Sequence, residues 1–199
     1  MLFRSYDRSP ARHYVLGTHG HNTIMVDGEG QARRGNRDTY VWPHPWDTPT
    51  PRGDDTIWQS TPEADFVRGS YTDGYGPKAA LKVKHTRRLL FAKPDYFILL
   101  DTLEPEGEQE HTYTSLFHID DTEASLDETT LAVRTATPDK ANLALIPARQ
   151  AGLAASVVKG QEEPFQGWSS HPWRAIPTAV YTWQATGPSH QAMVVHPLR

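Results

Sequence analysis

An alternating segment at residues 80–101 constrains the fold more than any other part of the chain. From Leu81 to Phe91 every second residue belongs to a largely apolar set, and most residues between them are polar or basic. Successive side chains of an extended strand point to opposite faces, so this period of two predicts a strand with one buried face. Lys93-Pro94-Asp95 has the composition of a turn, and residues 96–100 are apolar on both faces. The segment therefore predicts a β-hairpin.

Short strand-like runs separated by turn residues fill much of the remaining sequence. The 16 prolines and 14 glycines break the chain into short pieces, which disfavours long helices. We find no sustained helical period with caps, no internal repeat and no composition break. Further strands are expected at residues 23–26, 56–60, 65–71, 112–119, 130–135, 142–146, 154–158, 178–184 and 191–195. This spacing predicts an all-β fold, an antiparallel β-sandwich of two packed sheets that forms a single domain over residues 1–199.

Composition excludes several classes of protein. The chain has no cysteine, which rules out disulfides and thiolate metal sites. A formal net charge of -4 argues against a nucleic-acid partner, which usually requires a basic excess. The first residues lack a basic segment followed by an apolar one, so no signal peptide is expected. No apolar stretch is long enough to cross a bilayer, so no membrane partner is expected.

Histidines are the main candidates for chemistry. In His19-Gly20-His21 two imidazoles lie two residues apart, and in an extended strand both point to one face, which suits a shared metal ion. A third ligand could come from His118, from His85 or from a carboxylate, and the spacing does not decide among them. The alternative is that these histidines form hydrogen bonds in turns and in the core.

A basic stripe on the predicted hairpin is the main candidate for binding. Lys82, Lys84 and Arg88 share one strand face and could contact the carboxylates or sulfates of an acidic polysaccharide. The alternative is a solvated outer face. The carboxylate pairs Asp54-Asp55 and Asp120-Asp121 lie in expected turns, and neighbouring strand residues point in opposite directions, so neither pair forms a convincing acid/base couple.

Five segments occur in a recognisable order. They are residues 18–28 with His21-Asn22-Thr23, residues 87–101, residues 111–118, residues 160–169 and residues 177–180. The ordered set resembles the C-terminal part of the heparinase II/III-like polysaccharide lyases. The resemblance implies a β-sandwich that accompanies an N-terminal α-helical toroid, and cleavage of uronic-acid-containing polysaccharides by β-elimination. It also implies a tyrosine and a histidine as base and acid, in a cleft between the toroid and the sandwich.

The resemblance transfers few site residues to this chain. Some members bind zinc in the sandwich, and His21 matches the last of those zinc ligands. The earlier ligands and the toroid have no counterpart in this sequence, so the catalytic and substrate-binding residues stay unknown. Tyr6 is a candidate match for a tyrosine that precedes the His-Asn-Thr segment in some members. The resemblance implies a periplasmic or extracellular setting.

Three functions follow as hypotheses. The first is the sandwich portion of a polysaccharide lyase, with an acidic polysaccharide and a toroid domain or chain as partners. It predicts exposed apolar surface where the toroid would dock, and with it self-association. The second is a non-catalytic carbohydrate-binding module with an aromatic platform on one sheet face. The third is a cupin-like metal-dependent enzyme, in which His19 or His21, His85 and His118 would converge on one ion.

Overall fold

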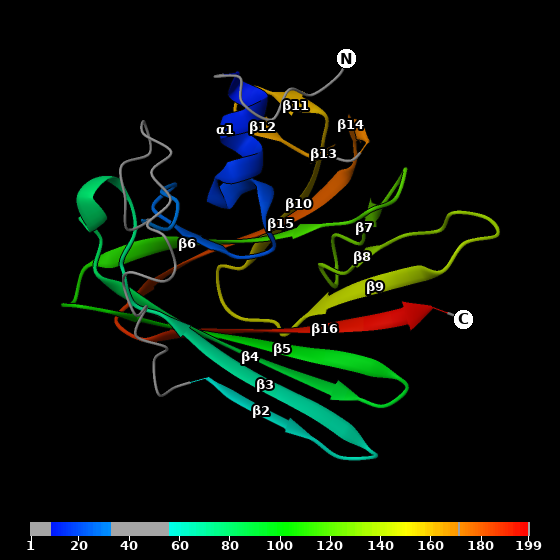
Figure 1. The fold of residues 1–199 in the computed structure, drawn as a ribbon, viewed down its shortest axis with the longest axis horizontal. Coiled ribbons are helices and arrows are strands. Elements are labelled where there is room, and N and C mark those ends of the chain that lie inside the picture. Colours follow the sequence, from blue (N-terminus) through cyan, green and yellow to red (C-terminus); the bar gives the residue numbers. More distant parts are fainter. Residues whose placement is uncertain (1–8, 33–55, 171, 199) are drawn as a thin grey trace, which may run out of the picture.

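Two large antiparallel sheets that face each other make up most of the structure (Figure 1). The structure is a computed structural model and describes residues 9–32, 56–170 and 172–198. The smaller sheet has the order β1-β6-β15-β10, with bounds Ile24–Val26, Glu110–His118, Pro177–Thr186 and Ala154–Lys159. The larger sheet has the order β2-β3-β4-β5-β16-β9-β8-β7, with bounds Ile57–Ser60, Ala64–Tyr71, Val83–Ala92, Tyr96–Pro105, Ser189–Leu198, Asn142–Pro147, Val133–Arg134 and Ser125–Leu126. The predicted β-sandwich is confirmed.

The alternating segment forms the middle of the larger sheet. β4 and β5 pair antiparallel, with Leu89 opposite Leu99 and Arg87 opposite Asp101. The set predicted to be buried faces the smaller sheet, and His85 in this set is only 4% exposed. The period of two therefore predicted both the strand and its buried face.

Two groups of buried side chains fill the space between the sheets, and both sheets contribute to each group. One group consists of Leu99, Phe117, Ile119, Val133, Leu145, Ala179, Tyr181 and Met193. The other consists of Ile24, Val26, Tyr75, Val83, Leu103, Tyr113 and Trp183. Because this apolar surface is removed from water only when the sheets pack, its burial is the main force that holds them together.

A short helix and two small hairpins lie together beside the smaller sheet (Figure 1). The helix α1 (Pro10–Leu16) begins at Ser9, whose hydroxyl accepts a hydrogen bond from the backbone N–H of Arg12 at 3.3 Å. The hairpins are β11–β12 and β13–β14, with bounds Gln161–Glu162, Phe165–Gln166, Trp168–Ser170 and Trp173–Ala175. The 3-10 turns η1 (Thr18–Gly20) and η2 (Pro77–Ala79) complete the elements. The sequence showed no sustained helical period and did not predict α1, because the seven residues of this helix make only about two turns.

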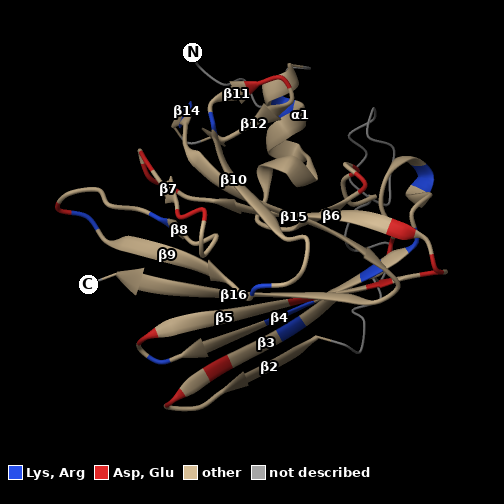
Figure 2. Ribbon diagram, turned by 180° about the vertical axis from the view of Figure 1, so that it is seen from behind, with Lys and Arg blue, Asp and Glu red and all other residues tan. Residues whose placement is uncertain are grey.

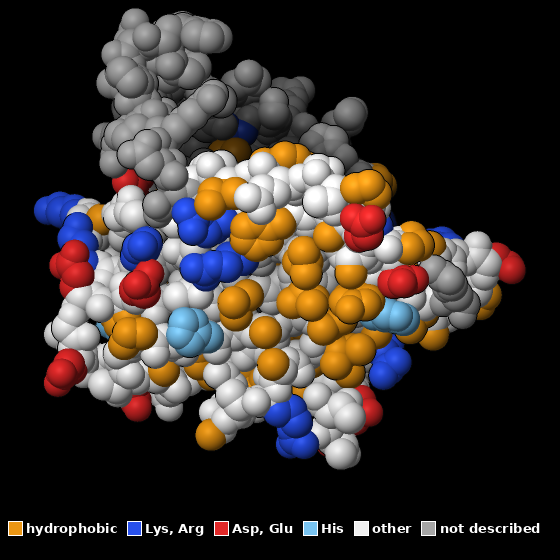
Figure 3. Space-filling model, turned by 90° about the horizontal axis from the view of Figure 1, so that it is seen from below, with side chains coloured by type: hydrophobic (Ala, Val, Ile, Leu, Met, Phe, Trp, Pro, Cys, Tyr) orange, Lys and Arg blue, Asp and Glu red, His pale blue; other side chains and the backbone are white. Residues whose placement is uncertain are grey.

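Apolar side chains gather over the outer face of the larger sheet (Figure 3). The strand register aligns Phe66, Leu90, Ile98, Val194 and Ile146 in one row across five strands. Ile146 is 37% exposed, and the other four are partly exposed. Apolar surface of the expected kind is therefore present, while its docking partner stays a prediction.

Charged residues of both signs are interspersed along the described strands and turns (Figure 2). The predicted basic stripe lies on the outer face of the larger sheet. There Lys84 pairs with Glu104 at 3.3 Å, and Arg88 donates to the Thr102 hydroxyl at 2.9 Å. Glu104 offsets the charge of Lys84, and the neutral Thr102 hydroxyl occupies a donor of Arg88, so the stripe offers less to an acidic glycan and the solvated-face alternative is favoured. Within the described residues, no helix is long and apolar enough to cross a membrane.

Candidate functional site

His118, the last residue of β6, lies at the centre of a polar cluster where α1 and the small hairpins meet the smaller sheet (Figure 1). Its backbone N–H donates to Asn22 Oδ1 at 2.7 Å, and its ring Nδ1 lies 3.0 Å from the same oxygen. Because a backbone N–H can only donate, the Asn22 atom must be the amide oxygen, and Nδ1 must then carry a proton. In the neutral ring, Nε2 is therefore a hydrogen-bond acceptor.

Two buried side chains meet that acceptor. The Tyr14 hydroxyl lies 2.9 Å from His118 Nε2, and the Gln166 amide nitrogen lies 3.1 Å from it. The Tyr14 oxygen also accepts a hydrogen bond from the Trp168 backbone N–H at 3.3 Å. Its single proton has the Trp168 carbonyl oxygen at 3.3 Å as a second acceptor, so the shorter contact identifies His118 as the stronger partner. The cluster joins α1, β6, the last residue of β12 and the first residue of β13.

Burial fixes the protonation states of this cluster. The pKa of His118 is lowered to about 4, chiefly by desolvation and also by the nearby His21, while a hydrogen bond with the His19 backbone acts in the opposite direction. Desolvation also raises the pKa of Tyr14, against two backbone hydrogen bonds that lower it. At neutral pH His118 is therefore an uncharged acceptor and Tyr14 keeps its proton.

A pocket of about 190 Å3 opens beside this cluster. Tyr14, His118 and Trp168 line it together with Val15, Gly20, Ser169, Ser170 and Ile176. The Trp168 ring stacks on Trp173 with a centroid distance of 5.2 Å and an interplanar angle of 8°. An aromatic wall next to hydroxyl groups is suited to a sugar ring, which presents apolar C–H faces and polar edges.

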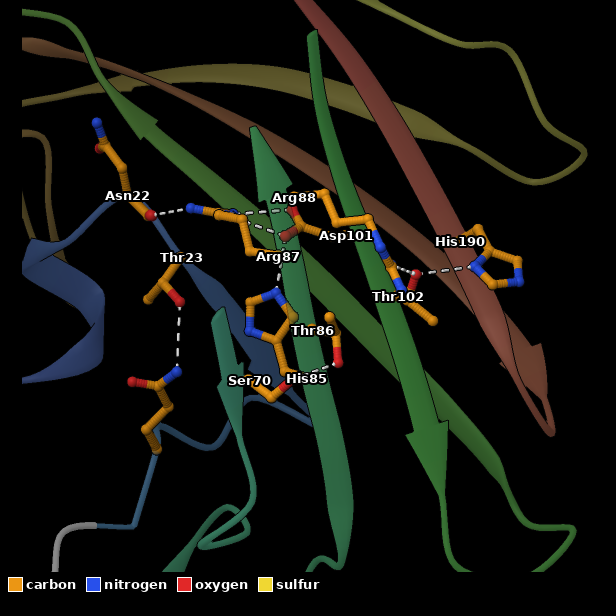
Figure 4. A network of polar contacts seen from close by, with 11 residues as sticks. Asn22, Thr23, Ser70, His85, Thr86, Arg87, Arg88, Asp101, Thr102 and His190 are labelled. Carbon is orange, nitrogen blue, oxygen red and sulfur yellow. Dashed lines mark hydrogen bonds and ion pairs between the residues drawn. The ribbon is translucent and has the colours of Figure 1, made fainter. Parts of the chain in front are cut away.

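A second polar network lies between the sheets and reaches the first through Asn22 (Figure 4). Asp101, which is 1% exposed, accepts from Arg87 Nε at 2.7 Å and from Arg87 Nη2 at 2.8 Å. His85 Nε2 lies 2.7 Å from the same carboxylate. Burial alone would raise the pKa of Asp101, but the hydrogen bonds from Arg87 and His85 outweigh it and hold this pKa below its usual range. Arg87 Nη1 also donates to the Asn22 carbonyl oxygen, which links the larger sheet to the segment before β1.

The predicted metal ligands do not come together in the described part of the chain. His21 is exposed, and its Nδ1 lies 2.7 Å from the Gly17 carbonyl oxygen. His85 and His118 belong to the two separate networks above. Among the described residues no three His, Asp or Glu side chains form a group that could hold a metal ion, whereas a protein zinc site needs three or four ligands. The arrangement does not fit zinc, and His21 as a zinc ligand stays a prediction.

Sequence reasoning named His118 but missed its partners Tyr14 and Asn22. Asn22 belongs to the His-Asn-Thr segment, in which the family resemblance pointed to the neighbouring His21. Tyr14 was missed with its helix, although Ser9-Pro10 has the composition of a helix start. The histidines at positions 85 and 118 form hydrogen bonds within the structure, as the alternative to a metal site predicted. Tyr6 lies outside the described residues.

The fold and the site define a β-sandwich whose smaller sheet carries a buried histidine–tyrosine cluster and a tryptophan-lined pocket. The chain belongs to the heparinase II/III-like family, since the family described as "Heparinase II/III-like, C-terminal" matches residues 3–169. A comparison with curated proteins found no match.

Several solved structures share this fold. A mutant of heparan sulfate lyase HepC from Pedobacter heparinus is 16% identical with a TM-score of 0.70, over 99% of this chain and 27% of that one. A structure titled "Heparinase III-BT4657 gene product" is 15% identical with a TM-score of 0.68, over 97% and 27%. Another heparinase III is 13% identical with a TM-score of 0.66, over 98% and 26%. The chain thus spans about a quarter of the length of these proteins, and at these identities the likeness concerns the fold.

Proposed function

We propose that the chain is the β-sandwich part of a polysaccharide lyase that acts on uronic-acid-containing polysaccharides, and that an α-helical toroid completes the active site. The observation that carries this proposal is the family match over residues 3–169, joined to a likeness that covers 99% of this chain but 27% of a heparan sulfate lyase. A sandwich that spans so small a share of such an enzyme would form one wall of its cleft.

The chemistry of β-elimination supports a shared site. A base must take the proton at C5, the electron pair must form the C4–C5 double bond, and the bond from C4 to the glycosidic oxygen must break while that oxygen gains a proton. The described cluster is engaged internally, because the Tyr14 proton is held by His118 Nε2 and the Nδ1 proton is held by Asn22. In this state neither group is free to act on a substrate, so we assign the elimination to residues supplied by the toroid together with this wall.

The pocket beside Tyr14 is the part of the wall that we assign to the glycan. Trp168 lines the pocket and stacks on Trp173, and Ser169 offers a hydroxyl beside it. This feature also favours the carbohydrate-binding module as a second candidate. However, these aromatic residues lie on the hairpin β13–β14. The module hypothesis placed its aromatic platform on the face of a sheet.

The test measures turnover and binding separately on heparin, heparan sulfate and alginate. Turnover is followed by the ultraviolet absorbance of the unsaturated uronate product, with and without added zinc. We expect the chain alone to bind one of these glycans without cleaving it. Trp168→Ala, which removes the tryptophan that lines the pocket, should weaken that binding, and Trp58→Ala, which removes a 69% exposed tryptophan on β2, is the matched control.

Either of two results would overturn the proposal. Turnover by the chain alone would show that a complete active site exists within these residues. Equal binding by the two tryptophan variants would remove the pocket from the glycan-binding wall.

A further inference from the structure

A second pocket, of about 200 Å3, lies between the two sheets on the other side of His118. Its walls are apolar, and residues of both sheets contribute to them. They are Leu99, Phe117, Ile119, Leu143, Leu145 and Val195. Asn22, Arg87 and His118 line the same pocket and are its polar members. A mostly apolar cavity with a few convergent polar groups is the usual form of a small-molecule site.

The polar members offer donors. The Arg87 guanidinium has five N–H groups, and three of them are used by Asp101 and the Asn22 carbonyl, so two remain. The Asn22 side-chain oxygen is occupied by the backbone and ring N–H groups of His118, so its NH2 group remains. His118 Nε2, the acceptor of this set, is taken by Tyr14. A ligand that enters here therefore meets hydrogen-bond donors.

The ion pair between Arg87 and Asp101 determines which charge faces the pocket. Asp101 is 1% exposed, whereas the Arg87 side chain is 24% exposed, so the positive end of the pair lies nearer the solvent. The carboxylate stays behind it, held also by His85. The pair is neutral as a whole, yet its dipole presents positive charge toward the Asn22 side of the pocket. Such an arrangement favours an acceptor that carries negative charge.

We propose that this pocket binds a small apolar group that bears a carboxylate or carbonyl oxygen. The ring or short acyl body would lie among Leu143, Leu145 and Val195, and the oxygen would accept from Arg87 and Asn22. The size is suitable, because a dry cavity of about 150 Å3 lined by Leu, Ile and Phe holds benzene. Such a group could be a free organic acid or an acyl substituent on a larger molecule. The inference does not rest on the proposed lyase role.

The experiment is a chemical-shift titration of the folded chain with benzoate, benzyl alcohol and benzylamine, which share one ring and differ in the head group. We expect saturable binding of benzoate, weaker binding of benzyl alcohol and weakest binding of benzylamine. The difference between the acid and the amine should reach about tenfold, the size expected for a charged hydrogen bond. A second arm uses benzamide linked to a soluble polymer, which tests whether an attached acyl group enters as well as a free acid.

Three variants locate the site. Leu143→Trp on the inner face of β9 fills the pocket and should abolish benzoate binding, and Val195→Trp on β16 is an independent filler should the first fail to fold. Ile146→Trp is the matched control, because it adds the same ring to β9 on the opposite, outer face. Asn22→Asp keeps the oxygen that accepts from His118 but replaces the NH2 donor with a negatively charged oxygen. It should therefore weaken the binding of benzoate more than the binding of benzyl alcohol.

The results decide the proposal without reference to lyase activity. The proposal is supported if the chain prefers benzoate, if Leu143→Trp and Val195→Trp abolish benzoate binding, and if Ile146→Trp retains it. Absence of saturable shifts, equal binding of benzoate and benzylamine, or binding that survives both fillers would overturn it.

Discussion

Replacing Asp101 with asparagine should destabilise the sandwich far more than replacing any exposed carboxylate. The two carboxylate oxygens accept three hydrogen bonds, one from His85 and two from Arg87. An asparagine keeps one acceptor oxygen, while its NH2 group faces a donor of Arg87. Breaking a buried ion pair by removing one partner costs about 3–5 kcal/mol. We expect about 3 kcal/mol, the lower end, because the Arg87 side chain left behind is 24% exposed.

The assay is urea denaturation of Asp101→Asn beside the control Glu104→Gln. Both residues lie on β5 and pair with a basic residue of β4, but the Lys84–Glu104 pair is 42% and 47% exposed. An exposed pair contributes about 0–1 kcal/mol, so the control should remain close to wild type. Equal losses of unfolding free energy in the two variants would refute the argument from burial.

The pH dependence gives an independent check on Asp101. Its pKa in the folded chain is lowered, so its contribution is present above the unfolded value near 4 and is lost as the pH falls through the folded pKa. The asparagine variant has no such group. The difference in unfolding free energy between wild type and Asp101→Asn should therefore become smaller in strong acid. A difference that stays constant with pH would contradict the role given to the Asp101 carboxylate.

Three further predictions concern the His118 cluster. The pKa of His118 is lowered to about 4, so its contribution to stability is complete above the unfolded value of about 6.5 and falls as the pH drops toward 4. His118→Gln should therefore reduce the dependence of the unfolding free energy on pH in this range, as measured by urea denaturation. Tyr14→Phe should cost about 1–3 kcal/mol, measured by urea denaturation, because it leaves the Trp168 N–H without its partner. Gly167→Ala should lower the melting temperature much more than Gly187→Ala. Both have positive φ, but a Cβ at Gly167 would lie 2.7 Å from a backbone atom, and at Gly187 it meets open space.

The parts of the fold that follow a period of two could be predicted from sequence. The hairpin of β4 and β5 and the strands β9, β10, β15 and β16 lie close to their expected ranges, because alternation and turn residues are local signals. The hairpins at residues 161–175 were missed. Each strand there has only two or three residues, which is too short for any period to show.

The candidate site could be predicted only in part, for a different reason. His118 was named as a site histidine, but its partners Tyr14 and Asn22 lie 104 and 96 residues away in the chain. Hydrogen bonds of such sequence separation depend on how the elements pack, and residue spacing carries no trace of them. The same holds for Asp101, because residues 96–100 are apolar on both faces and the sequence does not show that Arg87 is its partner across β4 and β5.

His118 is also a shared wall, because it lines both pockets. Binding in the two spaces is therefore coupled if a ligand in one of them moves this residue. A ligand on the tryptophan side that turns the imidazole changes the shape and the donors met by a ligand on the inter-sheet side. By thermodynamic linkage, each ligand then alters the affinity of the other by the same factor. One side chain thus lies between the two proposed binding spaces, and such a coupling would appear as a changed benzoate affinity in the presence of the glycan.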